Sequence, residues 1–209
     1  MVDKISSWKY AEEFAGETEA MRVARLRADE LGVECVTAAT GSALAVLAAS
    51  LGAKTIVEAG TGCGLSGLWL LSAAPNAVLA TIDTEPDRQN AAKTAFADAK
   101  IAANRTRVIA GRASEVMSNM ADGGYDLVFL DADRETLEEQ VAEAIRLVRR
   151  GGAIAIAHAL WRDRVPDPAL RDDSTAILRD VLRNLKSNEN FATSLTATGD
   201  GLLIAVKRA

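Results

Sequence analysis

The sequence has 209 residues, of which 49% are hydrophobic and 25% charged, with a formal net charge of −5 at pH 7. This length predicts a single domain, and this composition is ordinary for a globular protein. An acidic chain without a basic cluster is unsuited to nucleic acid, so we expect no nucleic-acid partner. The two cysteines form no CxxC pair, which favours reduced thiols and a cytoplasmic location.

The N-terminal segment is helical in pattern. We expect residues 1–34 to form a helical appendage, with one or two amphipathic helices over residues 6–31. Charged residues from position 3 onward interrupt any secretory signal. The uncharged run over residues 35–53 is rich in Ala, Ser, Thr and Gly, so it predicts a core helix and no membrane span.

Apolar, β-rich runs alternate with helical patterns from residue 54 onward. This alternation predicts an α/β fold, in which helices cover both faces of a mostly parallel sheet. The expected strands are 54–58, 77–82, 106–110, 125–130 and 153–157. The expected helices between them are 65–74, 86–102, 113–120 and 134–148.

The end of the chain has a different pattern. A helical segment over residues 174–186 precedes two short β-rich runs, 191–197 and 202–206. The runs are joined by Thr198-Gly199-Asp200-Gly201, a typical turn sequence. This arrangement predicts an antiparallel hairpin at the end of the sheet.

A glycine-rich segment follows the first expected strand. Glycines at positions 60, 62 and 64 permit a sharp turn and close approach of a ligand, and the next helix offers free N–H groups. Glu58, at the strand end, would repel a phosphate and suits a positively charged ligand, which favours S-adenosylmethionine. A nicotinamide-dependent reductase is the weaker alternative, because residues 62–67 match G-x-G-x-x-G two positions late.

Two further residues are suited to a nucleoside ligand. Asp83 ends the next expected strand, where a carboxylate can accept both ribose hydroxyls. Its alternative role is to start the helix at Pro86, where acidic residues are favourable. Ser66 could donate to a methionine carboxylate, or could serve only as a helix cap.

Several motifs then occur in order between about residue 35 and the C-terminus. They are residues 58–66 with Trp69, 81–83, 125–133, 147–152, 160–161 and 199–202. In this set the chain resembles the catechol and caffeoyl-coenzyme A type of O-methyltransferase, and more closely its small bacterial members. The resemblance implies a class I methyltransferase fold with a seven-stranded Rossmann-like sheet. It also implies S-adenosylmethionine as cofactor, a small-molecule hydroxyl such as a phenol or catechol as acceptor, and a homodimer.

The resemblance also implies which residues hold the cofactor. It places the methionine end near Val36 and Thr37, the ribose at Asp83, and the adenine between Ala113 and Ala132. The other cofactor residues that it implies are Glu58, Gly60, Thr61, Gly62, Cys63, Ser66 and Asp131.

The family's metal-binding pattern is altered in this chain. Members usually carry Asp-Ala-Asp-Lys and Asp-Asn, in which the first Asp and the Asp-Asn pair hold a divalent metal. Here the segments are residues 131–134, Asp-Ala-Asp-Arg, and residues 157–158, Ala-His. Alanine has no donor atom, imidazole is a poor ligand for Mg²⁺, and Asp133 could replace a ligand only if it turned inward. We therefore expect no tight magnesium site.

The same changes suggest other catalytic residues. Arg134 stays charged and cannot act as a base, but it can stabilise an oxyanion or bind a substrate carboxylate. His158 is the only histidine, and an imidazole can accept a proton near neutral pH. We hypothesise that His158 takes the hydroxyl proton, with Arg134 and Asp131 beside it. The alternatives are a decayed site and an S-adenosylmethionine-binding sensor or partner protein.

Overall fold

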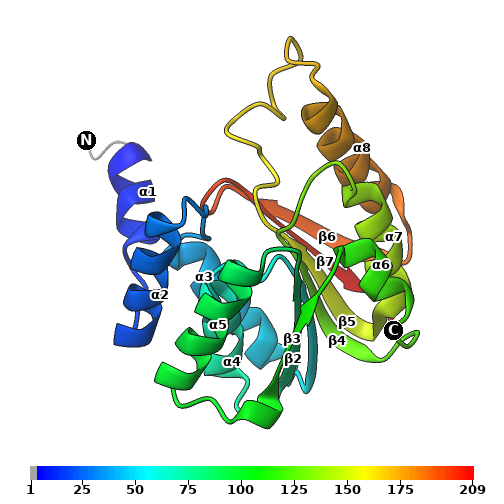
Figure 1. The fold of residues 1–209 in the computed structure, drawn as a ribbon. Helices are drawn as coiled ribbons and strands as arrows, with labels where there is room; N and C mark the ends of the chain where they lie inside the picture. The colour runs from blue at the N-terminus through cyan, green and yellow to red at the C-terminus, as the bar shows by residue number, and fades with distance from the viewer. Residues whose placement is uncertain (1–3) are drawn as a thin grey trace.

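A seven-stranded mixed sheet forms the centre of the fold (Figure 1). The computed structural model describes residues 4–209, and across them the strand order is β3-β2-β1-β4-β5-β7-β6. The strands are β1 (Thr55–Ala59), β2 (Val78–Asp83), β3 (Thr106–Ala110), β4 (Tyr125–Leu130), β5 (Val148–Ile156), β6 (Phe191–Thr196) and β7 (Leu202–Lys207). Strands β1 to β5 are parallel, and β7 is antiparallel to both β5 and β6. The predicted α/β class and the C-terminal hairpin are therefore confirmed.

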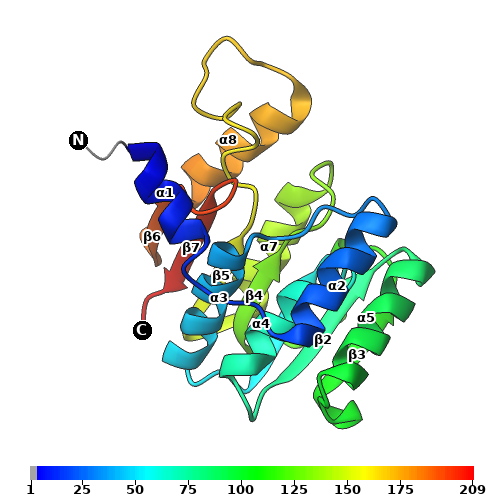
Figure 2. The same ribbon diagram turned by 90° about the vertical axis from the view of Figure 1, so that its left-hand side faces the viewer.

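Helices cover both faces of this sheet, as the two ribbon views show (Figures 1 and 2). One face carries α2 (Glu19–Glu30), α3 (Ala38–Ser50), α4 (Leu65–Ala73) and α5 (Pro86–Asp98). The other carries α6 (Ala113–Ser118), α7 (Leu137–Leu147) and α8 (Asp173–Ser187). A short 3₁₀ helix, η1 (Ala103–Arg105), leads into β3.

Strand β4 shows why the sheet needs helices on both sides. Leu127 and Phe129 pack into the core beneath α3 and α4, whereas Val128 and Leu130 pack into the core beneath α7 and α8. All four side chains are at most 1% exposed. Alternate residues of a strand point to opposite faces, so a continuous apolar run fits a strand that is buried on both.

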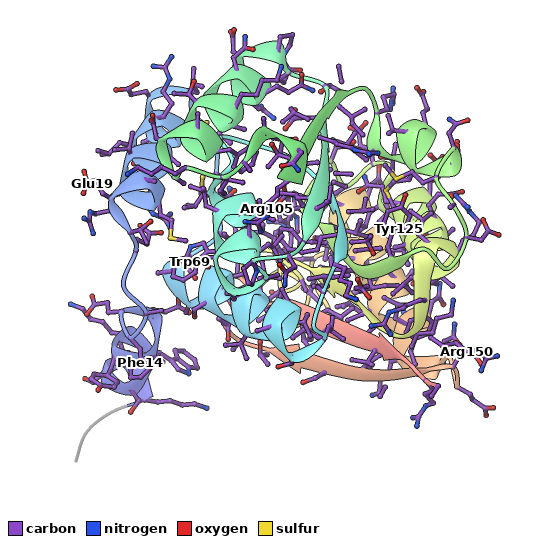
Figure 3. All side chains as sticks on the ribbon, turned by 90° about the horizontal axis from the view of Figure 1, so that it is seen from below. Phe14, Glu19, Trp69, Arg105, Tyr125 and Arg150 are labelled. Carbon is purple, nitrogen blue, oxygen red and sulfur yellow. The ribbon has the colours of Figure 1, made fainter. Side chains whose placement is uncertain are left out.

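The N-terminal segment forms two helices. Helix α2 docks on the body through Met21, Ala24 and Ala28, all buried. Helix α1 (Lys4–Glu12) has no buried residue. Figure 3 shows it at the periphery of the molecule, with Phe14 just beyond its end and Trp69 within the packed interior. Its last residue, Glu12, accepts a hydrogen bond from the N–H of Gly199 at 2.7 Å. Among residues 4–209, every helix falls short of the length and apolar character that a membrane crossing requires.

Three predicted boundaries are wrong by three to five residues. Helix α5 ends at Asp98, four positions before the expected end. Strand β5 begins at Val148, five positions before the expected start, because it continues through Gly151 (φ 73°) where its register with β4 shifts. Helix α7 begins at Leu137 and not at residue 134. The preceding residues form a turn in which the backbone N–H of Thr136 donates to Asp133 Oδ1 at 3.0 Å.

Candidate functional site

A cavity of about 320 Å³ opens beyond the carboxyl ends of β1, β2 and β4. Strand β1 pairs with β2 on one side and β4 on the other, so the chain reverses its direction of progress across the sheet here. Open α/β sheets bind their ligands at this position. The predicted site residues in the cavity lining are Val36, Gly60, Thr61, Gly62, Cys63, Ser66, Asp83, Ala113, Asp131, Ala132, Arg134 and His158.

The glycine turn packs closely on the segment after β4. Gly60 has a φ of 95°, and a Cβ on it would lie 2.2 Å from the carbonyl oxygen of Asp131. Gly62 has a φ of 48°, and its N–H donates to Asp83 Oδ2 at 3.0 Å. Side chains at these two positions would strain the backbone, and at Gly60 would also collide with Asp131. The turn therefore brings backbone close to the cavity at positions where only glycine fits well.

Glu58 lies beneath this turn and does not itself line the cavity. It is completely buried, and Thr81 Oγ1 donates to its Oε2 at 2.6 Å. Its Oε1 has no hydrogen-bond partner in the described residues. Burial raises the pKa of Glu58 to about 7, although the hydroxyls of Ser66 and Thr81 act to lower it. A buried carboxylate oxygen without a donor fits a ligand that brings a positive group to this floor.

Asp83 both supports the start of α5 and lines the cavity. Its Oδ2 accepts from Gly62 and its Oδ1 accepts from the N–H of Glu85 at 3.0 Å, which helps to start α5. It also lines the cavity, with Arg88 Nη1 3.9 Å away. Thr37, in contrast, lies outside the cavity lining, because its hydroxyl caps α3 by accepting from Thr40 N–H at 3.2 Å.

His158 lies at the other end of the cavity between two carboxylates. Its Nε2 is 3.6 Å from Asp131 Oδ1, and its Nδ1 is 3.2 Å from Asp200 Oδ2. Its side chain is 10% exposed. Burial raises the pKa of Asp131 well above its usual range, while the charge of Arg134 opposes that shift. The imidazole is thus held in a largely buried position between two acidic side chains.

Arg134 stacks on an aromatic ring at the same end. Its guanidinium carbon is 3.6 Å from the centre of the Trp161 ring, a cation–π contact. Within the described residues the guanidinium makes no hydrogen bond and no ion pair, so its donors are available to a ligand. Burial lowers the pKa of Arg134, opposed chiefly by the nearby charge of Asp131.

The donor set at this position does not fit magnesium. Asp133 Oδ1 accepts from both the N–H and the hydroxyl of Thr136, so this carboxylate faces the start of α7. Ala157 offers only a methyl group. Over residues 4–209, no three His, Cys, Asp or Glu side chains are placed to hold a metal ion together.

Three features of the site were not predicted from the sequence. Asp200 was assigned to the hairpin turn and to a family motif without a role in the site, and Glu34 only to the appendage, yet both face His158. Arg112 lines the cavity beside Ala113. Asp200 could have been found only by knowing that β7 pairs with β5 and brings the turn next to residue 158.

The two thiols are poor nucleophiles. Cys63 lines the cavity and Cys35 also contributes to it, and both are unpaired. Burial raises the pKa of Cys35 to about 12 and also raises the pKa of Cys63. Because the thiolate is the reactive form, neither residue is suited to covalent catalysis.

Comparisons of the sequence and the fold with known proteins agree on one family. The O-methyltransferase family model matches residues 16–208. A Mycobacterium ulcerans protein, whose name assigns it provisionally to the O-methyltransferases, is 44% identical over 199 residues, which are 95% of this chain and 89% of that protein. A crystal structure of a Corynebacterium glutamicum protein matches with a TM-score of 0.91 and 31% identity, covering 99% and 98% of the two chains. The O-methyltransferase TomG from Streptomyces achromogenes, solved with S-adenosylmethionine, matches in fold with a TM-score of 0.85 and 24% identity over the whole of both chains.

Proposed function

The chain belongs to the O-methyltransferase family, and we propose that it transfers a methyl group from S-adenosylmethionine to the hydroxyl of a small phenol-like molecule without a tightly bound metal. Family membership favours this function over a nicotinamide-dependent reductase. The proposal depends most on one observation, which is that an unpaired carboxylate oxygen is buried beneath the wall of a cavity that an imidazole lines. Glu58 Oε1 is buried under the glycine turn, and His158 lines the cavity with Arg134.

The residues of the cavity suit S-adenosylmethionine. The carboxylate of Glu58 fits the positive charge of that molecule, and Ser66, in the cavity lining, would donate its hydroxyl to the methionine carboxylate. Asp83 uses one lone pair of each oxygen on backbone N–H groups, which leaves others for ribose hydroxyls. Val36 and the backbone of Gly60 to Cys63 would border the methionine end, and Ala113 and Ala132 the adenine. Thr37 would act indirectly, by fixing the start of α3.

The proposed chemistry divides between three side chains. When bound, S-adenosylmethionine supplies an electrophilic methyl group on a positively charged sulfur, and the transfer leaves a neutral thioether. The Nε2 lone pair of His158 accepts the proton of the acceptor hydroxyl, whose oxygen forms the new bond to the methyl carbon. Arg134 stabilises the negative charge on that oxygen, and Asp131 stabilises the imidazolium. Holding the acceptor in line with the carbon–sulfur bond contributes several further kcal/mol.

A methyl-transfer assay with a panel of phenols and catechols, with and without EDTA, tests this function. We expect at least one phenol to be methylated at a rate that EDTA leaves unchanged. Replacing His158 with Ala should lower kcat by about 100-fold or more, because it removes the proton acceptor. Full activity of His158→Ala would contradict the base role. Binding of S-adenosylmethionine with no transfer to any acceptor would instead favour a sensor or partner protein.

We also propose that the protein is a cytoplasmic homodimer. Trp8 and Tyr10 in helix α1, and Phe14 just after it, are all more than half exposed. Large apolar side chains gathered on one exposed segment favour a contact between copies. Light scattering of the purified chain should give twice the mass of 22.1 kDa, and a monomer mass would contradict this assembly.

A further inference from the structure

The turn between β6 and β7 holds His158 from the side opposite Asp131. Asp200 Oδ2 lies 3.2 Å from Nδ1 of the ring. Because a carboxylate only accepts hydrogen bonds, this contact assigns the donor role, and so the ring proton, to Nδ1. The other nitrogen, Nε2, then carries the lone pair and faces Asp131 and the cavity.

The second oxygen of Asp200 is bound to backbone. The N–H of Arg162 donates to Asp200 Oδ1 at 2.6 Å. The backbone adds two contacts, since Leu160 N–H donates to Asp200 O at 2.9 Å and Ala159 N–H donates to Gly201 O at 3.0 Å. A Cβ on Gly201 would lie 2.6 Å from Leu160 N, so glycine is needed for this close approach.

The loop that carries His158 needs such support. His158, Trp161, Arg162 and Asp163 all have positive φ values, between 50° and 60°. Residues other than glycine adopt this conformation only where their surroundings impose it, and such strain is concentrated at functional sites. Asp200 contacts this run at two points, the ring of His158 and the N–H of Arg162.

Glu34 is the competing carboxylate near the same ring nitrogen. Its Oε1 is 4.0 Å from Nδ1, beyond hydrogen-bond distance, and its side chain is 53% exposed. Its Oε2 accepts from Arg162 Nη2 at 2.9 Å. Glu34 is therefore engaged elsewhere, and Asp200, which is 19% exposed, is the better placed of the two.

We propose that Asp200 is a positioning residue, which orients the His158 ring and keeps its proton on Nδ1 so that Nε2 is open to the acceptor hydroxyl. This inference rests on the proposed base role of His158. It adds the requirement that the ring keep one tautomer. The contact of His158 with Asp131 would not impose that tautomer by itself. A side chain that fixes both ring orientation and tautomer is the usual partner of a catalytic imidazole.

The variant Asp200→Asn gives a sharp prediction. The N–H of Arg162 requires an acceptor, so the amide oxygen should take the place of Oδ1 and the amide NH₂ should face the ring. A donor facing Nδ1 makes that nitrogen an acceptor, and the ring proton should move to Nε2. The lone pair would then point away from the acceptor hydroxyl.

Nitrogen NMR can read this directly, because the chain has a single histidine. The tag-free protein, labelled with ¹⁵N-histidine, would be measured at about pH 8.5, where an ordinary imidazole is neutral. We expect the Nδ1–H tautomer in the wild type and in Asp200→Glu, which keeps a carboxylate. We expect the Nε2–H tautomer in Asp200→Asn, and no change in Glu34→Gln. A wild-type ring protonated on Nε2, or a tautomer that Asp200→Asn leaves unchanged, would overturn the proposal.

Kinetics provide a second readout. Asp200→Asn should lower kcat by about tenfold or more, while the Kd for S-adenosylhomocysteine stays within about twofold. Asp163→Asn, on the same loop and exposed, should leave both values unchanged. The ¹⁵N NMR spectrum of the His158 ring tests the positioning role whether or not a methyl acceptor is identified. Loss of activity in His158→Ala with an unchanged tautomer in Asp200→Asn would refute this inference and leave the proposed function intact.

Discussion

Glu58 is the residue at which the requirements of folding and of ligand binding oppose one another most clearly. A fully buried carboxylate with one unpaired oxygen is costly when ionised, and burial accordingly raises the pKa of Glu58 to about 7. A positively charged ligand would favour the ionised form. The fold therefore carries a destabilising group at the place where S-adenosylmethionine is proposed to bind.

The pH dependence of stability tests this reading of Glu58. Its folded pKa is about 7 and its ordinary value 4.5, so the folded state holds the proton more tightly. The contribution of Glu58 to the free energy of unfolding should be greatest below pH 4.5, fall by about 3 kcal/mol as the pH rises to 7, and then level off. Denaturant titrations of cofactor-free wild type and Glu58→Gln should show that the variant lacks this fall. Parallel pH profiles would show that folding does not raise the pKa of Glu58.

Asp126, at the start of β4, binds residues at the starts of β1 and β5. These strand ends lie away from the cavity. Its Oδ2 accepts from the N–H groups of Lys54 and Thr55 at 2.7 and 2.9 Å, and Arg149 Nε donates to its Oδ1 at 2.6 Å. Burial alone would raise the pKa of Asp126, but these bonds lower it below its usual value. Their contribution to stability is therefore present at neutral pH and is lost as the pH falls through that lowered pKa.

Replacing Asp126 with Ala should lower the free energy of unfolding by about 3 kcal/mol, because buried backbone donors lose a charged acceptor. Asp122→Ala is the matched control, since this carboxylate also binds an arginine, Arg146, but its side chain is 78% exposed. Its loss should cost less than about 1 kcal/mol. Equal effects in denaturant titrations would contradict the role given to Asp126.

The type and order of the elements after residue 54 could be predicted because hydrophobic periodicity and turn residues are local signals. The boundaries of helices and strands could not be predicted where tertiary contacts determine them. Strand β5 extends back to Val148 because this residue pairs with Tyr125 of β4, which the local helical pattern of residues 134–148 could not reveal. The turn before α7 depends on side-chain contacts, in which the N–H and the hydroxyl of Thr136 both donate to Asp133 Oδ1.

At the scale of the whole molecule, the site is assembled from segments far apart in the chain. The glycine turn follows β1, Arg134 follows β4, His158 follows β5, and Asp200 precedes β7. The first three could be predicted because parallel strands end at one edge of the sheet. Asp200 and Glu34 could not, because their approach to His158 depends on the antiparallel return of β7 and the path of the N-terminal segment.

Restoring the family's ligand pair tests the argument about the metal. In the double variant Ala157→Asp/His158→Asn, oxygen donors join Asp131 where the chain now has a methyl group and an imidazole. We expect isothermal titration to detect Mg²⁺ binding to this variant and none of comparable strength to the wild type. Ala157→Asp alone should bind more weakly, because the imidazole stays. Micromolar binding of Mg²⁺ to the wild type would show that the donor argument is wrong.

The most direct measurement is a crystal structure of the wild-type chain soaked with S-adenosylhomocysteine. The account predicts that the nucleoside fills the cavity, with its ribose hydroxyls on Asp83, its adenine beside Ala113, and its sulfur on the side of His158. The amino group should lie over the floor that Glu58 forms. A cavity left empty at saturating ligand, or a nucleoside bound away from the turn at Gly60, would contradict the account.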